Sequence, residues 1–174
     1  MTSWRENYLV KKAVFIDRDD TIAKDVPYCS KPEDLKLFQG IGKSIKKLND
    51  KGFLVIIITN QSGIARGFFN ERTLEKIHEK MKKDIEKDGG HIDAIYYCPH
   101  HPNDKCECRK PGTKLIEEAA NEYNISLKDS YVIGDRLHDI EMGKKMGCKT
   151  IYINNYNDQG ISFNEAVEKI LKKK

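Results

Sequence analysis

Short apolar runs in this chain alternate with longer segments in which apolar residues recur every three or four positions. The runs are rich in β-branched and aromatic residues and predict buried strands at 13–16, 53–58, 93–97, 130–133 and 149–153. The longer segments have the period of helices with one buried face, at 41–51, 71–87, 113–123, 137–146 and 163–171. This alternation predicts βαβ units, so we expect a doubly wound, mostly parallel, five-stranded α/β sheet with helices on both faces.

The segment 71–87 shows the helical pattern most clearly. Leu74, Ile77, Met81 and Ile85 recur at helical spacing, which gives the predicted helix one apolar stripe. His78 and His91 are expected to be surface residues.

Length and composition indicate one domain over residues 1–174, without repeats or linkers. Hydrophobic residues make up 39% and charged residues 33% of the chain, as in ordinary globular proteins. The net charge of +4 is compatible with a phosphorylated substrate but is not a signature of nucleic-acid binding. No large insertion follows Thr21 or Thr59, so we expect no separate cap domain.

The apolar segments also bear on localisation. Residues 1–6 contain no signal-peptide core, and the longest apolar run, 53–58, is too short to cross a bilayer. We therefore expect a cytoplasmic protein. Because thiols stay reduced in that compartment, the five cysteines are better interpreted as ligands or buried side chains than as disulfides.

Polar side chains follow four of the predicted strands. Asp17 and Asp19 follow the first strand, Thr59 the second and Asp135 the fourth, while Lys110 ends the irregular segment after the third. The carboxyl ends of parallel strands share one edge of the sheet, where ligands bind in such folds. An Asp-rich turn after a strand is also common without any function. Clustered carboxylates repel each other unless a cation joins them, and a hard oxygen-liganded ion such as Mg²⁺ suits them.

These motifs carry a resemblance to the haloacid-dehalogenase-like phosphatases. The chain has Asp-x-Asp-x-Thr at 17–21, then Thr59, then Lys110, and finally the acidic pair Asp135 and Asp139. The stretches 59–67 and 106–111 are similar to a narrower group, the D-glycero-D-manno-heptose-1,7-bisphosphate 7-phosphatases and the related histidinol-phosphate phosphatases. The resemblance extends over about residues 14–153.

The resemblance implies a Mg²⁺-dependent phosphomonoester hydrolase that works through an aspartyl-phosphate. Asp17 would be the nucleophile, and Asp19 would act first as general acid and then as general base. Mg²⁺ would be held by Asp17, the Asp19 backbone carbonyl and Asp135, with Asp139 in support. Thr59 and Lys110 would stabilise the transferring phosphoryl oxygens.

The same resemblance implies that loops contact the substrate. The implied contacts are Asp25, Tyr28, Asn60, Gln61, Ser62, Arg109 and Arg136. The fork-shaped guanidinium groups of the two arginines suit a second phosphate, so a heptose bisphosphate is the first choice and histidinol phosphate the alternative. We expect a monomer that acts on a small sugar phosphate, without nucleic-acid or membrane partners.

Three further polar residues near these motifs are not expected to contribute to chemistry. Asp20 stands where close relatives usually have Gly, and we expect its carboxylate to point to solvent. Arg66 and His138 are expected to be solvated or packing residues.

A second group of possible metal ligands lies in the predicted loop 98–108. Cys98, His100, Cys106 and Cys108 fall within eleven positions, and three thiolates with one imidazole suit a closed, tetrahedral, structural Zn²⁺ site. His101 is a rival ligand, and only the resemblance favours His100. Cys29 and Cys148 fit no pair and are expected to be plain thiols, Cys148 in the core.

Two other protein classes share part of this pattern. Receiver domains of signalling proteins also place acidic residues, a Thr and a Lys at strand ends, but their acceptor Asp follows a middle strand, where this chain has Cys98-Pro99-His100. Nucleic-acid 3′-phosphatases share the Asp-x-Asp-x-Thr core, but they need a basic groove with aromatic platforms, which this sequence does not show.

Overall fold

The computed structural model describes residues 9–156 and 160–172; residues 1–6, considered above for a signal peptide, lie outside this range. Its centre is a sheet of five strands in the order β3-β2-β1-β4-β5, in which every neighbouring pair is parallel. The strands are β1 (Lys12–Ile16), β2 (Phe53–Asn60), β3 (Ala94–Cys98), β4 (Tyr131–Gly134) and β5 (Lys149–Tyr152). The helices are α1 (Ile41–Asp50), α2 (Glu71–Glu86), α3 (Lys114–Tyr123), α4 (Leu137–Lys145) and α5 (Phe163–Lys172), with short 3₁₀ turns at Pro32–Asp34 and Leu127–Asp129.

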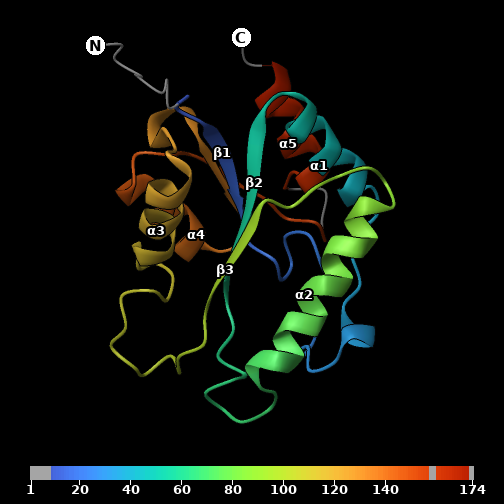
Figure 1. Cartoon of the computed structure of the whole chain (residues 1–174), viewed down its shortest axis with the longest axis vertical. Helices are drawn as coiled ribbons and strands as arrows, with labels where there is room; N and C mark the ends of the chain where they lie inside the picture. The colour runs from blue at the N-terminus through green and yellow to red at the C-terminus, as the bar shows by residue number, and fades with distance from the viewer. Residues whose placement is uncertain (1–8, 157–159, 173–174) are drawn as a thin grey trace, which may run out of the picture.

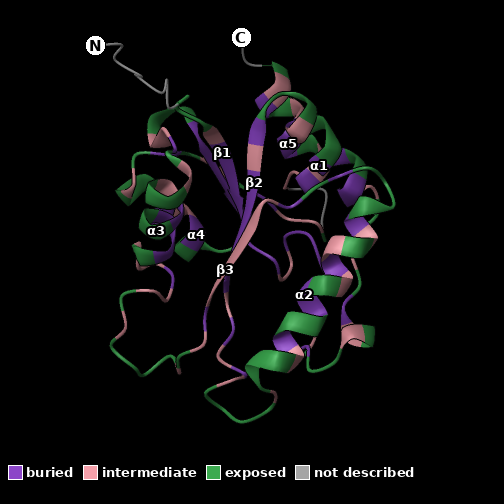
Figure 2. Cartoon of the chain, viewed as in Figure 1, coloured by how far each residue is buried: buried purple, intermediate pink, exposed green. Residues whose placement is uncertain are grey.

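Helices cover both faces of the sheet (Figure 1). The core on one face joins α1, α2 and α5 to the strands, and the core on the other face joins α3 and α4 to them. Successive residues of β1 alternate between the two cores, since Val14 and Ile16 belong to the first and Ala13 and Phe15 to the second. The central strands are buried on both sides (Figure 2), as expected for a parallel sheet.

The predicted doubly wound fold is therefore confirmed. The predicted ends of these elements agree with the structure or differ from it by one residue, except that β2 continues two residues further, through Thr59 to Asn60. No cap domain is present among residues 9–156 and 160–172.

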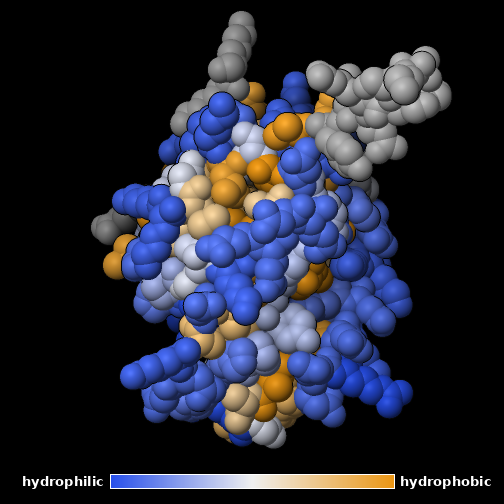
Figure 3. Space-filling view, turned by 60° about the vertical axis from the view of Figure 1, so that its left-hand side comes forward, coloured by the Kyte–Doolittle hydropathy of each residue, from blue (hydrophilic) through white to orange (hydrophobic). Residues whose placement is uncertain are grey.

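No helix within these ranges is long and apolar enough to cross a membrane. Polar and charged side chains cover much of the face that carries α3 and α4, with apolar side chains between them in smaller groups (Figure 3).

The strand order places a topological switch point between β1 and β4. From β1 the chain proceeds through β2 to β3 on one side, and then continues with β4 and β5 on the other. In open parallel sheets the ends of the strands beside such a point diverge and leave a crevice for ligands. Asp17 follows β1 there, and its backbone N–H donates to the Ile133 carbonyl of β4 at 3.1 Å.

The expectation that His78 is a surface residue is wrong. His78 lies on the buried side of α2 with 8% of its surface exposed, and its ring makes an edge contact with Tyr97. Burial, with smaller contributions from Arg18 and Lys82, lowers the pKa of His78 to about 3. The imidazole is therefore neutral in the folded protein at pH 5, whereas it is protonated in the unfolded chain below its ordinary pKa of 6.5.

Acidification should consequently destabilise the protein through His78. A base whose pKa falls on folding contributes stability that is complete above the unfolded pKa and is lost as the pH falls below it. Between pH 7 and pH 5 this residue should remove about 2 kcal/mol from the free energy of unfolding. Urea denaturation of His78→Gln at both pH values should show a pH dependence smaller by that amount. His91→Gln, at an exposed site, is the matched control, and an unchanged pH dependence in His78→Gln would contradict this assignment.

Candidate active site

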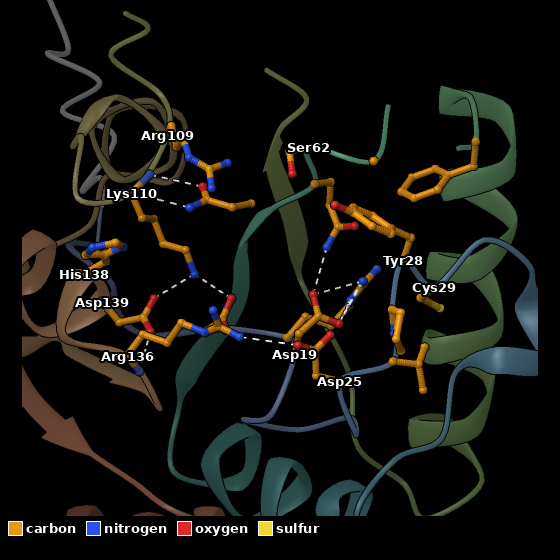
Figure 4. A pocket seen from close by; sticks show the side chains of 18 residues that line it. Asp19, Asp25, Tyr28, Cys29, Ser62, Arg109, Lys110, Arg136, His138 and Asp139 are labelled. Atoms are coloured by element: carbon orange, nitrogen blue, oxygen red, sulfur yellow. Dashed lines mark hydrogen bonds and ion pairs between the residues drawn. The ribbon is translucent and has the colours of Figure 1, made fainter. Parts of the chain in front are cut away.

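A buried ion-pair cluster lies where β1, β2 and β4 end. The Lys110 ammonium is 2.5 Å from Asp17 Oδ1 and 2.7 Å from Asp139 Oδ1, and it also donates to the Ile58 carbonyl at 2.9 Å. All three charged side chains are at most 7% exposed. Lys110 reaches from its loop down to Asp139 in Figure 4. The predicted nucleophile and the predicted lysine, 93 positions apart, are therefore in direct contact.

The charges in this cluster shift one another's pKa. Burial raises the pKa of Asp17, although Lys110 acts in the opposite direction. Burial alone would lower the pKa of Lys110, but Asp17 and Asp139 outweigh it and raise this pKa above its ordinary value. Lys110 is therefore a fixed cation, and Asp17 depends on it to carry a negative charge inside the protein.

Asp135 completes a group of three carboxylates at the end of β4. Oxygens of Asp17, Asp135 and Asp139 lie within 4.8 Å of one another. Burial, and next the negative charge of Asp17, raise the pKa of Asp135 to about 7. Thr21 Oγ1 donates to Asp135 at 2.9 Å. Two cations face these three carboxylates: the buried Lys110 ammonium and the more exposed Arg136 guanidinium, whose Nε is 3.6 Å from Asp135 Oδ2. One negative charge remains in excess, and these oxygen donors fit a hard divalent cation.

The structure places Asn60, predicted as a substrate contact, against the backbone of Lys110. Its side-chain amide accepts from the Lys110 N–H at 3.1 Å and donates to the Lys110 carbonyl at 3.4 Å. These two bonds join the end of β2 to the loop that carries the lysine. The Lys110–Pro111 peptide bond that follows is cis.

Asp19 has a separate set of partners. Arg18 donates to both of its oxygens, from Nε to Oδ1 and from Nη2 to Oδ2 at 3.0 Å each. Gln61 Nε2 donates to Asp19 Oδ2 at 3.0 Å and also to Thr59 Oγ1 at 2.8 Å. Arg18 was not predicted to belong to the site, although its position between two aspartates in the motif could have indicated it. Gln61, predicted to touch substrate, joins Asp19 to Thr59.

A cleft of about 380 Å³ opens over these residues. Its lining includes Asp17, Asp19, Asp25, Tyr28, Asn60, Gln61, Ser62, Arg109, Lys110, Arg136, His138 and Asp139. Every predicted substrate contact therefore lies around one cavity. His138, expected to be solvated or packed, is exposed and also lines this cleft. Thr59 and Asp135 are not part of this lining; Thr59 is fully buried and bonded to Gln61.

Two contacts shape the mouth of the cleft. Arg136 reaches towards Asp25, with 3.3 Å between Nη2 and Oδ2 (Figure 4). On another side, the ring of Tyr28 lies 4.1 Å from that of Phe68. The two contacts join loops that follow different strands, so several parts of the chain enclose the cleft in place of a cap.

The carboxylate of Asp20 does not simply point to solvent, which corrects the prediction. It accepts from the Asp25 N–H at 2.9 Å and from the Tyr156 hydroxyl at 2.5 Å. Asp20 has a φ of 56°, in the left-handed region that favours Gly, so these bonds hold the backbone in a conformation that glycine adopts freely. Asn155 adds bonds to the Asp20 and Thr21 carbonyls at 2.8 and 3.0 Å.

A second cluster of possible metal ligands lies in the loop after β3. Cys98 Sγ is 3.6 Å from Cys106 Sγ and 3.5 Å from His100 Nδ1, which is 3.2 Å from Cys108 Sγ. Tetrahedral Zn²⁺ ligands of this kind are separated by about 3.3–3.8 Å, given the usual Zn–S and Zn–N bond lengths. His100, and not its rival His101, lies among the three thiols; the His101 ring accepts from the Asn103 N–H at 3.2 Å.

Comparisons with known proteins show the family of this chain. A family model described as HAD-hydrolase-like matches residues 107–160. The D-glycero-beta-D-manno-heptose-1,7-bisphosphate 7-phosphatase of Haemophilus ducreyi is 42% identical over 147 residues, 80% of this chain and 81% of the relative. The D-glycero-alpha-D-manno-heptose-1,7-bisphosphate 7-phosphatase of Photorhabdus laumondii is 36% identical over 149 residues, 82% of this chain and 81% of that protein. The chain belongs to the HAD-like phosphatases, in the family of these relatives.

A solved structure extends the comparison to three dimensions. The D,D-heptose 1,7-bisphosphate phosphatase of B. bronchiseptica, complexed with magnesium and phosphate, has a TM-score of 0.85 and 29% identity. The match covers 94% of this chain and 99% of that one. This HAD-like phosphatase is therefore a hydrolase of phosphate esters, and the family resemblance predicted from the motifs is confirmed.

Proposed function

We propose that this phosphatase removes the 7-phosphate of D-glycero-D-manno-heptose 1,7-bisphosphate in a Mg²⁺-dependent reaction through an aspartyl-phosphate on Asp17. The observation that carries the proposal is the buried cluster in which Lys110 contacts both Asp17 and Asp139 beneath an open cleft. The substrate follows from the relatives, which are named for both anomers of this compound.

The magnesium ligands would be Asp17, the Asp19 backbone carbonyl and Asp135, with Asp139 beside them. Two observations support this set: the close approach of the three carboxylates and the raised pKa of Asp135, which is caused first by burial and next by the negative charge of Asp17. Mg²⁺ bound there would neutralise the carboxylates and the phosphoryl oxygens.

Asp17 then attacks phosphorus as the bond from phosphorus to the sugar oxygen breaks. Asp19, in its carboxylic acid form, gives its proton to that oxygen. In the second step a water oxygen attacks phosphorus, its proton passes to Asp19, and the bond to Asp17 breaks to release inorganic phosphate. Lys110 and Thr59 stabilise the transferring oxygens by charge and hydrogen bonding.

The second phosphate would bind at the rim formed by Arg109 and Arg136. Arg109 Nη1 is buried and has no hydrogen-bond partner among the described residues. A buried guanidinium nitrogen without a partner is unfavourable by itself, and a phosphate oxygen would satisfy it. The Arg136 side chain is 58% exposed and contacts Asp25 at 3.3 Å and Asp135 at 3.6 Å. A phosphate would replace the contact with Asp25, since both are anionic partners of the guanidinium.

The cysteine cluster would hold a structural Zn²⁺ that fixes the loop bearing Arg109 and Lys110. Cys106 and Cys108 immediately precede these residues, and the Arg109 backbone N–H interacts with the Cys106 sulfur. The loop is tightly packed, since a Cβ at Gly112 would lie 2.2 Å from the Glu107 carbonyl oxygen. All four ligand positions are filled by protein, so this site would take no part in the chemistry.

The proposed substrate predicts a preference for bisphosphates. A non-reacting phosphate on Arg109 should orient the substrate and raise kcat/KM by more than about tenfold over the matching monophosphate. Arg109→Ala should reduce this ratio, whereas Arg66→Ala, at an exposed site outside the cleft, should leave it unchanged. The measurement is steady-state kinetics on both heptose bisphosphate anomers, heptose 7-phosphate and histidinol phosphate. A higher kcat/KM on histidinol phosphate than on every sugar bisphosphate would replace the first-choice substrate by the alternative.

The zinc assignment predicts that loss of the metal impairs catalysis at a distance. Cys106→Ser should lose Zn²⁺ and lower kcat/KM on the order of a hundredfold, because small displacements of Lys110 misplace its charge. Metal analysis, kinetics and circular dichroism should be performed on one preparation. Cys148→Ala is the control. Cys148 belongs to the buried core on the face of α3 and α4, so its replacement should leave zinc content and activity at the parental level. A zinc-free Cys106→Ser enzyme with full activity would refute the coupling.

A further inference from the structure

Arg18 is one of the most deeply buried charged side chains of the molecule, with 1% of its surface exposed. It stands between Asp17 and Asp19 in the sequence and contributes to the wall of the cleft. Its third nitrogen, Nη1, is buried and makes no hydrogen bond to any described residue. A buried donor without a partner costs about 1–3 kcal/mol, and buried ion pairs are often no better for stability than apolar residues of similar volume. Stability alone therefore gives little reason for a guanidinium at this position.

The contacts of Arg18 are concentrated on Asp19. Nε and Nη2 bind the two carboxylate oxygens in the forked geometry of a bidentate pair, at 3.0 Å each, and Nη2 also lies 2.8 Å from Oδ1. Such pairs fix the orientation of a carboxylate as well as its position. Gln61 Nε2 adds a third donor to Oδ2. The Asp19 side chain still has 21% of its surface exposed, so it remains accessible from the cleft.

The two aspartates of the turn are thus held by different cations. Asp17 contacts Lys110, and Asp19 contacts Arg18. This separation matters because the proposed roles differ: the Asp17 oxygen must approach phosphorus, whereas the Asp19 carboxyl group must meet the leaving oxygen. A side chain as short as Asp, in a turn, needs external contacts to keep one orientation.

We propose that Arg18 is a positioning residue that, together with Gln61, orients the Asp19 carboxyl group towards the leaving oxygen. The inference rests on the proposed role of Asp19 as general acid and base. It adds that the efficiency of this proton transfer depends on a guanidinium that neither gives nor takes the proton. Through Gln61, which also donates to Thr59 Oγ1, the same contacts link Asp19 to the residue proposed to stabilise the transferring phosphoryl oxygens.

The test uses the dependence of the rate on the leaving group. Phosphoenzyme formation from a sugar phosphate needs a proton on the leaving oxygen, whereas p-nitrophenolate leaves without one. In Arg18→Met, which removes the charge at similar length, kcat/KM for heptose bisphosphate should fall on the order of a hundredfold. The pre-steady-state burst of p-nitrophenolate from p-nitrophenyl phosphate should stay within about threefold of the parent, because proton transfer does not limit it. Arg66→Met should change neither rate.

Two further variants keep the test decisive if Arg18→Met folds poorly. Arg18→Lys retains the charge but not the fork, and should show the same selective loss in smaller degree. Arg18→Ala should recover heptose bisphosphate activity when millimolar guanidinium is added, but not when sodium chloride is added at the same ionic strength. Equal losses for both substrates in all three variants, without recovery by guanidinium, would mean that Arg18 only supports the fold and would overturn the proposal.

Asp19→Asn separates this inference from the function on which it rests. If Asp19 is the general acid, this variant should lose sugar phosphate activity while keeping the p-nitrophenolate burst. Without that pattern in Asp19→Asn, the proposed role of Asp19 fails, and the positioning role of Arg18 fails with it. With that pattern present, a uniform loss in the Arg18 variants rejects the positioning role alone.

Discussion

The ion pair between Lys110 and Asp17 is the interaction on which the rest of the site depends. A carboxylate buried at the end of a β-strand would be protonated without a compensating charge, and a protonated Asp17 would be a poor nucleophile. The ammonium supplies that charge at 2.5 Å and is itself held by Asp139 and by the Ile58 carbonyl. Each partner is unfavourable in the interior alone, so the nucleophile, the lysine and the acidic residue of α4 require one another.

Delivering Lys110 to this position requires several parts of the chain. Asn60 at the end of β2 binds the lysine's backbone on both sides, while the compact loop before it brings together three cysteines and a histidine. Lys110 therefore reaches the site from a loop that Asn60 holds at the lysine itself and that packs its cysteines together just before it. At the mouth of the cleft, Arg136 and Asp25 contact each other at 3.3 Å, and both side chains are more exposed than Lys110. Enzymes commonly carry binding residues on loops that a rigid scaffold positions.

Much of this architecture follows from local sequence signals. The strands were predictable because they are continuous apolar runs, and the edge of the sheet that holds the site followed from their parallel arrangement. The motif residues Asp17, Lys110, Asp135 and Asp139 do lie together. His78 could have been recognised as buried, since it lies four residues after Leu74 and three before Met81, on the apolar stripe of α2.

Other features depend on tertiary contacts that no local pattern encodes. The Tyr156 hydroxyl that binds Asp20 comes from 136 positions away, so the conformation of that turn was not readable from the motif. The choice between His100 and His101 rests on where a loop without regular structure folds. Likewise, Gln61 and Asn60 were identified from a stretch of sequence, but only the fold determines that they bind Asp19 and Lys110.

Phosphorylation of Asp17 can be detected by mass spectrometry of an acid-quenched reaction. The Asp19→Asn enzyme, mixed with p-nitrophenyl phosphate and Mg²⁺, should form the phosphoenzyme readily but hydrolyse it slowly, since water activation is impaired. We expect a phosphoryl group on Asp17, in the peptide that contains it, and none when Asp17 is also replaced by Asn. A burst of p-nitrophenolate with no phosphorylated peptide, or with the phosphoryl group on another residue, would contradict this expectation.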